Sequence, residues 1–207
     1  MILLTGFEPF GGATFNPSAA IADGAARILR ESGADAVSEL LTCAFAQAPA
    51  ELNSLLDLHG PDVVINLGLA AGRKSLSLEK VAINHVDARI PDNAGAQPID
   101  EPVLAGAPNA YFSTLPLKAA MHHLTGQPGG VPVEISYSAG TFVCNQVFFA
   151  LMHRLAREPG ARGGFIHVPW LEPGDALIES LAEAVASVAT LALAGATEPV
   201  FSAGLES

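Results

Sequence analysis

Apolar and polar positions along the chain follow two periods, and strand-like and helix-like segments alternate. An apolar run at residues 2–5 predicts a strand, and the helix after the next glycine-rich loop has Asn16 as N-cap and Pro17 at its first position. Further strands are predicted at residues 36–42, 62–67, 75–83, 132–137 and 163–168, and further helices at 48–59, 116–125, 143–155 and 174–194. This order predicts a single α/β domain over residues 1–207, with an open, twisted, largely parallel sheet and helices on both faces.

The ends of the predicted strands indicate where an active site would form. In parallel α/β sheets, functional loops gather at the carboxyl ends of the strands. The loops expected to open on that edge follow Thr5, Leu67, Ile83, Tyr137 and Val168. The apolar alternation of the 75–83 strand breaks near Glu79, which predicts a change of register. Residues 85–116 are rich in proline and glycine and lack periodicity, which is typical of a functional loop.

Composition and charge narrow the class of protein. Of the 207 residues, 50% are apolar and 15% are charged, which indicates a well-packed globular chain. The formal net charge of −11 argues against nucleic acids and anionic membranes as partners, because an acidic surface repels both. The apolar stretch at 184–196 is too short to span a bilayer. We expect a cytoplasmic protein without a secretion signal, whose two cysteines stay free in a reducing compartment.

One segment, residues 138–146, concentrates the candidate chemistry. It follows the 132–137 strand, turns at Gly140 and opens the helix that carries Cys144 in its first turn. Backbone N–H groups at a helix start lower the pKa of a thiol and favour the nucleophilic thiolate. The same order of a strand, a tight turn and a helix presents the nucleophile in α/β-hydrolases. The alternative interpretation of Cys144 is a buried side chain that behaves as a small hydrophobe.

A catalytic thiol needs a base, and the chain has six histidines. His167 lies near the end of the 163–168 strand on the predicted active edge, and His85, just after the 75–83 strand, is the competing candidate. The remaining four lie on helical segments, where solvated or capping roles are the default: His59, His122, His123 and His153. No cysteine and histidine spacing resembles a zinc site, so we expect no metal.

Charged residues in and around the 75–83 strand are candidates for the remaining roles. Glu79 interrupts the apolar alternation and is the candidate acid that would orient the base. The alternative is an edge-strand charge at Glu79 that pairs with Lys80 or Arg73. Arg73 and Arg89 flank the region, and each is either a surface cation or a group that stabilises negative charge on a reacting carbonyl.

Six blocks of the sequence match a known family in residue type and order. They are residues 6–12 with 16–18, 70–73, 79–84, 88–93, 138–145 and 163–169. They occur in the family's order and are spread over roughly residues 1–170, and the blocks around Phe10 and Cys144 are the most specific. The set resembles the pyroglutamyl-peptidase I (pyrrolidone-carboxylate peptidase) family of cysteine peptidases.

The resemblance implies the catalytic roles. It implies a peptidase that removes an N-terminal pyroglutamyl (5-oxoprolyl) residue through a thioester, with Cys144 as nucleophile and His167 as base. Glu79 would be the carboxylate that orients the base, and Arg89 would stabilise the oxyanion together with the backbone N–H of Cys144. It further implies a cytosolic protein, often a homotetramer, that uses no metal or organic cofactor.

The resemblance also implies how substrate binds. The lactam ring would lie against Phe10 and Phe142, with polar contacts from main-chain groups near Leu69. The chain departs from the family at two positions, because Leu69 stands where Gln is common and Lys80 where Arg is usual. A main-chain contact at position 69 would leave Leu69 harmless, whereas a side-chain amide contact would be lost.

Two other classes of function remain open on the sequence. A redox or thiol-sensing protein is one, although the chain has no Cys-x-x-Cys and Cys43 lies in a different segment. A non-catalytic small-molecule-binding or phosphorylase-like α/β protein is the other, because such folds host many functions. The loop around Gly11 and Gly12 lacks the Lys-Ser/Thr of a phosphate-binding P-loop.

Overall fold

The computed structural model describes residues 1–127, 130–158 and 160–204. The strands are β1 (Ile2–Phe7), β2 (Ala36–Leu41), β3 (Val63–Leu69), β4 (Leu76–Glu79), β5 (Val81–Ile83), β6 (Ala110–Phe112), β7 (Val133–Ser136) and β8 (Arg162–Val168). The helices are α1 (Pro17–Glu31), α2 (Gln47–His59), α3 (Leu117–Thr125), α4 (Val143–Leu155) and α5 (Leu177–Leu193). Within the described residues, no helix is both long and apolar enough to cross a membrane.

Six of the strands form one sheet in the order β2-β1-β3-β8-β4-β7. The strands β2, β1, β3 and β8 run parallel to one another, and β7 runs parallel to β4. The pair β4 and β8 is antiparallel, with Ser77 opposite His167 and Glu79 opposite Phe165. The sheet is therefore largely parallel, as the sequence predicts, and only its last two strands are reversed.

The reversal of β4 and β7 corrects one expectation about the active edge. The loops after β1, β3 and β8 do leave from one edge of the sheet. The expectation that the loops after Ile83 and Tyr137 leave from the same edge is wrong, because Ile83 ends β5 in the small sheet and β7 runs in the opposite direction. These two loops meet each other instead, since the backbone N–H of Asp87 donates to the Thr141 carbonyl and the Thr141 hydroxyl donates to the Asp87 carbonyl.

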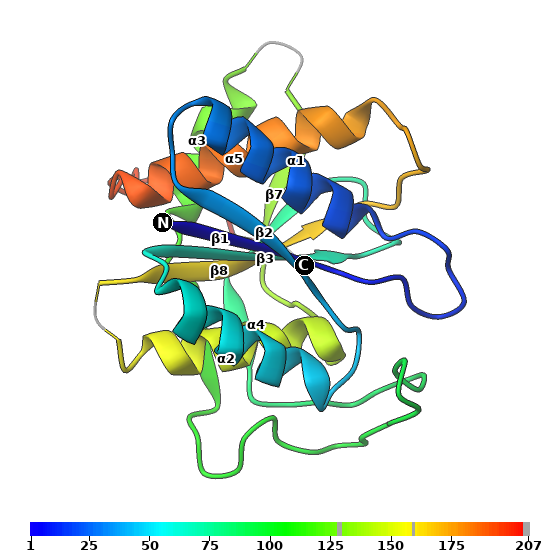
Figure 1. Cartoon of the computed structure of the whole chain (residues 1–207). Helices are drawn as coiled ribbons and strands as arrows, with labels where there is room; N and C mark the ends of the chain where they lie inside the picture. Colours follow the sequence, from blue (N-terminus) through cyan, green and yellow to red (C-terminus); the bar gives the residue numbers. More distant parts are fainter. Residues whose placement is uncertain (128–129, 159, 205–207) are drawn as a thin grey trace.

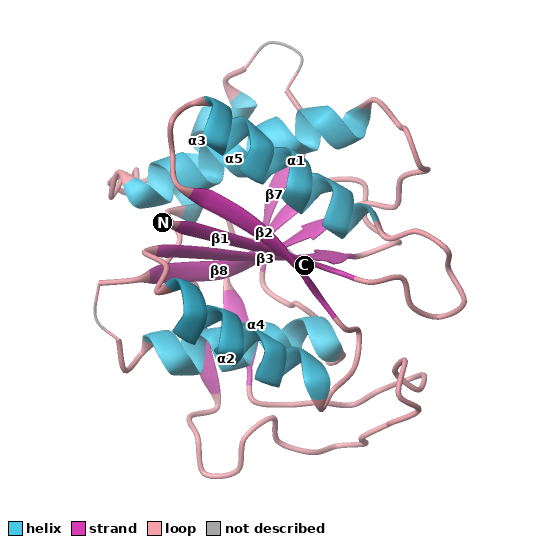
Figure 2. Cartoon of the chain, viewed as in Figure 1, coloured by secondary structure: helices cyan, strands magenta, loops and turns pink. Residues whose placement is uncertain are grey.

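Helices cover both faces of the sheet, with α1, α3 and α5 on one side and α2 and α4 on the other (Figures 1 and 2). Successive residues of a strand point to opposite faces. In β8, Ile166 and Val168 pack into the core under α1, α3 and α5, whereas Phe165 packs into the core under α2 and α4. The same alternation places His167 on the α2 and α4 face.

The packing of α1 on β1 depends on a cap and a glycine. The Asn16 side chain accepts a hydrogen bond from the backbone N–H of Ser18 at 3.1 Å, and Pro17 occupies the first turn. A Cβ on Gly6 would lie 2.5 Å from the Cα of Ala19, so only glycine allows the helix to approach this closely. The glycine-rich loop between β1 and α1 is thereby held at the active edge.

The long loop predicted at residues 85–116 contains one short strand. Within it, β6 pairs antiparallel with β5, which places Ala82 opposite Tyr111. The predicted register break near Glu79 is confirmed, because the chain leaves the large sheet at Lys80 and continues into this small one. The rest of the loop runs along the side of the molecule that carries α2 and α4 (Figure 1).

Candidate active site

Cys144 is the second residue of α4 and lies over the end of β3. A Cβ built on Gly68 would lie 2.8 Å from the Cys144 Sγ, a separation that real side chains do not adopt. Gly68 in turn is opposite His167 in the parallel pairing of β3 and β8. The missing side chain at Gly68 therefore lets the thiol approach the sheet beside the strand that carries His167.

His167 is held by a buried carboxylate. Its Nδ1 lies 2.7 Å from Oε1 of Glu79, and the two residues are 4% and 0% exposed. Because β4 runs antiparallel to β8, Glu79 lies diagonally across from His167 on the same face of the sheet. An ionised carboxylate accepts the Nδ1 proton, which leaves Nε2 as the ring nitrogen that can act on a thiol.

Glu79 has a second partner in Arg73. The Arg73 guanidinium donates from Nη1 to Glu79 Oε1 at 2.6 Å and from Nη2 to the Ser138 carbonyl at 2.7 Å. Glu79 is therefore not an edge-strand charge, because β4 lies between β8 and β7, and its carboxylate contacts both an arginine and a histidine. Lys80 lies elsewhere, with its ammonium 5.6 Å from the centre of the Phe112 ring.

The protonation state of Cys144 differs from the sequence prediction. Burial raises the pKa of the thiol above its ordinary value, and the neighbouring Cys43 and Glu79 raise it further. The backbone N–H at the helix start and Arg73 lower the pKa, but their influence is smaller. The prediction that the helix start favours the thiolate is therefore wrong, because desolvation outweighs the helix dipole. The thiol is neutral at pH 7, so attack requires a base to take its proton.

The competing histidine lies away from this cluster. The His85 side chain is 38% exposed, and its Nδ1 is 3.9 Å from a carboxylate oxygen of Asp100. Only the main chain of His85 contributes near α4, because its carbonyl accepts a hydrogen bond from the Asn145 side chain. The structure thus brings His167 rather than His85 to the Cys144 side of the sheet.

The start of α4 is left open at its N-terminus. The N-cap residue Phe142 makes no side-chain capping hydrogen bond, so backbone N–H groups of the first turn remain available as donors.

The residue after the cysteine, Asn145, fixes the helix start to the small sheet. The Asn145 side chain accepts from the Ile83 N–H at 3.0 Å and donates to the carbonyls of Ile83 and His85, each at 2.9 Å.

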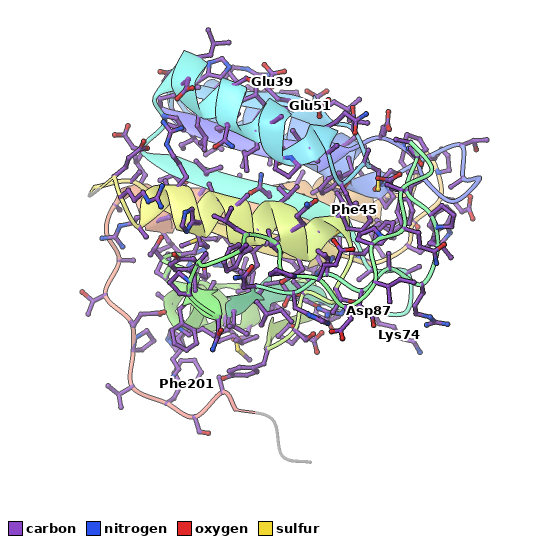
Figure 3. All side chains as sticks on the ribbon, turned by 90° about the horizontal axis from the view of Figure 1, so that it is seen from below. Glu39, Phe45, Glu51, Lys74, Asp87 and Phe201 are labelled. Carbon is purple, nitrogen blue, oxygen red and sulfur yellow. The ribbon has the colours of Figure 1, made fainter. Side chains whose placement is uncertain are left out.

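Phe142 and two other aromatic side chains form a cluster. The ring of Phe10 lies 6.2 Å away, centre to centre, and the ring of Phe45 meets Phe142 edge-on at 5.1 Å. The sequence resemblance pointed to Phe10 and Phe142 but not to Phe45, which lies between predicted elements without any motif. Figure 3 shows Phe45 at the same end of the molecule as Lys74 and Asp87.

Hydrogen bonds tie the Phe10 loop to the segment that precedes Phe45 and to the long loop. The Glu8 carboxylate accepts from the Cys43 N–H at 3.1 Å and from the Asn93 side chain at 2.7 Å. Asp92 accepts from the Phe45 N–H at 2.7 Å, which fixes the third aromatic residue. The sequence pattern did not single out Glu8 or Asp92. The structure shows that their carboxylates join the loops around the aromatic cluster.

The remaining two candidates lie on the rim of this region. Arg89 is exposed, and no carboxylate in the described residues forms an ion pair with it. The residue after it, Ile90, approaches the Phe10 loop, because a Cβ on Gly11 would lie 4.0 Å from Ile90 Cδ1. Leu69 is the last residue of β3 and is half-buried, directly after Gly68.

Within the described part of the chain, no group of three or more His, Cys, Asp and Glu side chains is arranged to hold a metal ion. The cysteines Cys43 and Cys144 are both free thiols. The chemistry that the site offers is thus that of a thiol, an imidazole, a carboxylate and a guanidinium. A thiol at a helix start beside an imidazole held by a buried carboxylate is the arrangement of a cysteine-type hydrolase.

Comparison with known proteins identifies the family. The family model for pyroglutamyl peptidase matches residues 1–198. The pyrrolidone-carboxylate peptidase of Erwinia tasmaniensis is 51% identical over 171 residues, which cover 82% of this chain and 78% of that protein. The corresponding enzyme of Clavibacter michiganensis is 46% identical over 206 residues, or 95% of this chain and 94% of that one.

Solved structures agree with the sequence comparison. A crystal structure of pyroglutamyl peptidase I from Bacillus amyloliquefaciens matches with a TM-score of 0.84 and 38% identity, over 97% of this chain and 98% of that one. The pyrrolidone carboxyl peptidase of Pyrococcus furiosus gives a TM-score of 0.84 and 38% identity, over 94% and 98% of the two chains. The chain belongs to the pyroglutamyl peptidase family of cysteine-type hydrolases.

Proposed function

We propose that this protein is a cysteine peptidase that hydrolyses the amide bond after an N-terminal pyroglutamyl residue. One observation carries the proposal: the Cys144 thiol lies over Gly68, beside a His167 whose Nδ1 is 2.7 Å from the buried carboxylate of Glu79. The names of the relatives support the substrate class, since they are pyroglutamyl and pyrrolidone-carboxylate peptidases.

The first chemical step is acylation of the thiol. His167 takes the Cys144 proton at Nε2 while the sulfur attacks the pyroglutamyl carbonyl, and the imidazolium then protonates the leaving amine. This order of events follows from burial, which keeps the free thiol neutral until a base acts on it. Glu79 holds the Nδ1 proton and stabilises the positive charge that forms on the ring.

The second step releases the acid. A water molecule loses a proton to His167 and attacks the thioester carbonyl, which returns the thiol to Cys144 and frees pyroglutamate. Negative charge develops on the carbonyl oxygen in both steps. We assign its stabilisation to the backbone N–H of Cys144 at the uncapped start of α4 and to Arg89.

The pyroglutamyl ring is uncharged and nearly planar, so a site built from aromatic faces suits it. Phe10, Phe142 and Phe45 form such a group next to the start of α4. Polar contacts to the lactam would come from main-chain groups near Leu69, which makes the loss of a glutamine side chain there harmless. A charged N-terminal amine would lose its hydration in this site without gaining a partner.

Release of a fluorescent amine from its pyroglutamyl amide tests the proposal. We expect turnover of this substrate, none of the glutaminyl and glutamyl amides, and loss of turnover after alkylation with iodoacetamide. The Cys144→Ala variant is the matched control, because it removes the nucleophile and leaves the rest of the site in place. An active Cys144→Ala protein, or a wild type that does not cleave the pyroglutamyl amide, would contradict the assignment.

We further propose that the protein works as a cytoplasmic homotetramer, on the strength of the family resemblance. Light scattering on the purified chain tests the oligomeric state, with a mass of four chains as the expected result. Fractionation of the producing cells tests the location. A stable monomer that cleaves the pyroglutamyl amide would contradict the tetramer without affecting the chemistry.

A further inference from the structure

Arg73 connects two parts of the active site that lie far apart in the sequence. It ends a turn that is fixed to the large sheet. The backbone N–H of Ala70 donates to the Val168 carbonyl at 3.0 Å, and the backbone N–H of Arg73 donates to the Ala70 carbonyl at 2.9 Å. From there its guanidinium reaches Glu79 at 2.6 Å and the Ser138 carbonyl at 2.7 Å. Arg73 therefore links the orienting carboxylate to the segment that leads into Cys144.

Glu79 needs this partner because it is completely buried. A carboxylate in such a place stays ionised only if nearby charges and hydrogen bonds compensate for lost hydration. Its Oε1 accepts from both Arg73 and His167, while its Oε2 is buried without a hydrogen-bond partner in the described residues. Arg73 is the permanently charged cation that pairs with this carboxylate.

We propose that Arg73 is a positioning residue for the reaction: it compensates the buried negative charge of Glu79 and holds the loop before Cys144 at a fixed distance from that carboxylate. The proposal deepens the proposed function and rests on it for the kinetic consequences. Its electrostatic part concerns the free protein alone and is independent of any substrate.

Several charged or titratable groups lie around the Arg73–Glu79 ion pair, on the surrounding elements. Cys144 approaches from α4, and Cys43 from the segment after β2 is close enough to influence the same thiol. On the other side, Ser77 lies opposite His167 and donates to a carboxylate oxygen of Glu134 on β7 at 2.7 Å. The two members of the ion pair act on Cys144 in opposite directions: Arg73 lowers the pKa of the thiol and Glu79 raises it.

The rate at which iodoacetamide alkylates Cys144 depends on the fraction of thiolate, so it measures the opposing effects of Arg73 and Glu79 without a substrate. In Arg73→Gln the positive charge is lost and Glu79 is left uncompensated, so both effects disfavour the thiolate. We expect alkylation at pH 8 to slow by about tenfold, with the site assigned to Cys144 by mass spectrometry. This factor corresponds to a rise of roughly one unit in the thiol pKa when a nearby positive charge is removed. In Arg73→Lys the charge remains, and the rate should stay within about threefold of wild type.

The double variant Arg73→Gln/Glu79→Gln separates charge balance from a loss of structure. It removes both opposing charges, so alkylation should recover to within about threefold of wild type. Lys74→Gln is the matched control, because Lys74 is the exposed next residue and the change in net charge is the same. It should alkylate at the wild-type rate.

Steady-state kinetics on the pyroglutamyl amide complete the test. Arg73→Gln should lower kcat by about ten- to a hundredfold with KM within about threefold, because a charge-assisted contact that orients the base is lost and the substrate pocket is not. An Arg73→Gln protein that alkylates at the wild-type rate, or a double variant slower than Arg73→Gln, would overturn the inference. A wild type that fails to cleave the amide would reject the proposed function instead, and alkylation would still decide the role of Arg73.

Discussion

Gly68 lies directly beneath the thiol of Cys144, so close that a single added carbon would sit 2.8 Å from the sulfur. The same carbon would come within 2.7 Å of the Phe165 ring. The two residues belong to different segments, one at the end of β3 and the other at the start of α4. The distance of the Cys144 sulfur from the sheet is thus set by the lack of a side chain at Gly68 on β3.

The first prediction follows from this contact. Gly68→Ala should displace the sulfur or the Phe165 ring and lower kcat by about ten- to a hundredfold, since displacements of about 1 Å have effects of this size. Thermal unfolding should show that the fold survives. Gly72→Ala is the control, because a Cβ there meets nothing within 4 Å. Wild-type kcat in Gly68→Ala would mean that the thiol is not confined as described.

The second prediction separates the two cysteines. Cys144→Ala should abolish turnover, while Cys43→Ser should keep kcat/KM within a few-fold of wild type. Cys43 is 2% exposed and packs into the core under α2 and α4. Progress curves with the pyroglutamyl amide measure both. A large loss of kcat/KM in a stably folded Cys43→Ser protein would assign this thiol a part in the reaction.

The third prediction concerns the base and the residue that orients it. His167→Ala should lower kcat by several orders of magnitude, and Glu79→Gln should lower it less, because an amide can still accept the Nδ1 hydrogen bond. His85→Ala should retain activity, since its side chain points toward Asp100. The assignment fails if kcat depends on His85 and not on His167.

The fourth prediction concerns the aromatic pocket. Phe142→Ala and Phe10→Ala should each raise KM by about tenfold or more, as expected for about 1.5 to 3 kcal/mol of lost apolar contact. Phe45→Ala should act in the same direction through Phe142, which it contacts edge-on. None of the three variants should gain activity on the glutaminyl amide. Unchanged KM in all of them would place the substrate elsewhere.

The fifth prediction is a loss of stability at alkaline pH. Burial raises the pKa of the Cys43 thiol to about 12, and burial also raises that of Cys144. Between about pH 9 and 12 the unfolded chain releases these protons before the folded one, so stability falls by up to about 1.4 kcal/mol per pH unit for each thiol. Denaturant midpoints from pH 8 to 10.5 should fall less steeply in Cys43→Ala. Parallel curves for wild type and variant would show that Cys43 does not contribute.

Much of the fold could be predicted because its elements carry strong local signals. Asn16 and Pro17 mark the start of α1, and the apolar runs at 62–67 and 163–168 correspond to β3 and β8. The direction of β4 and β7 could not be predicted, since periodicity is the same for parallel and antiparallel strands. The strand β6 could not be predicted because three residues, Ala110–Phe112, are too few to show a period of two.

The site was predictable as far as motifs reach. The blocks around Cys144 and His167 indicate a thiol and a base, but the sequence alone does not show how deeply the thiol is buried. For that reason the sign of its pKa change was predicted wrongly. Phe45 stands outside the matched motifs, and its contact with Phe142 exists only once α2 and α4, which these two residues precede, have packed on the same face of the sheet.

Asn145 makes the small sheet part of the catalytic apparatus. Its side chain binds both the N–H and the carbonyl of Ile83 on β5 and reaches the His85 carbonyl as well. The residue beside the nucleophile is therefore hydrogen-bonded to a two-stranded sheet whose strands contribute no chemistry. We therefore expect activity to depend on whether the small sheet has docked against α4, so that a chain with a complete large sheet and an undocked small sheet would be largely folded and still inactive.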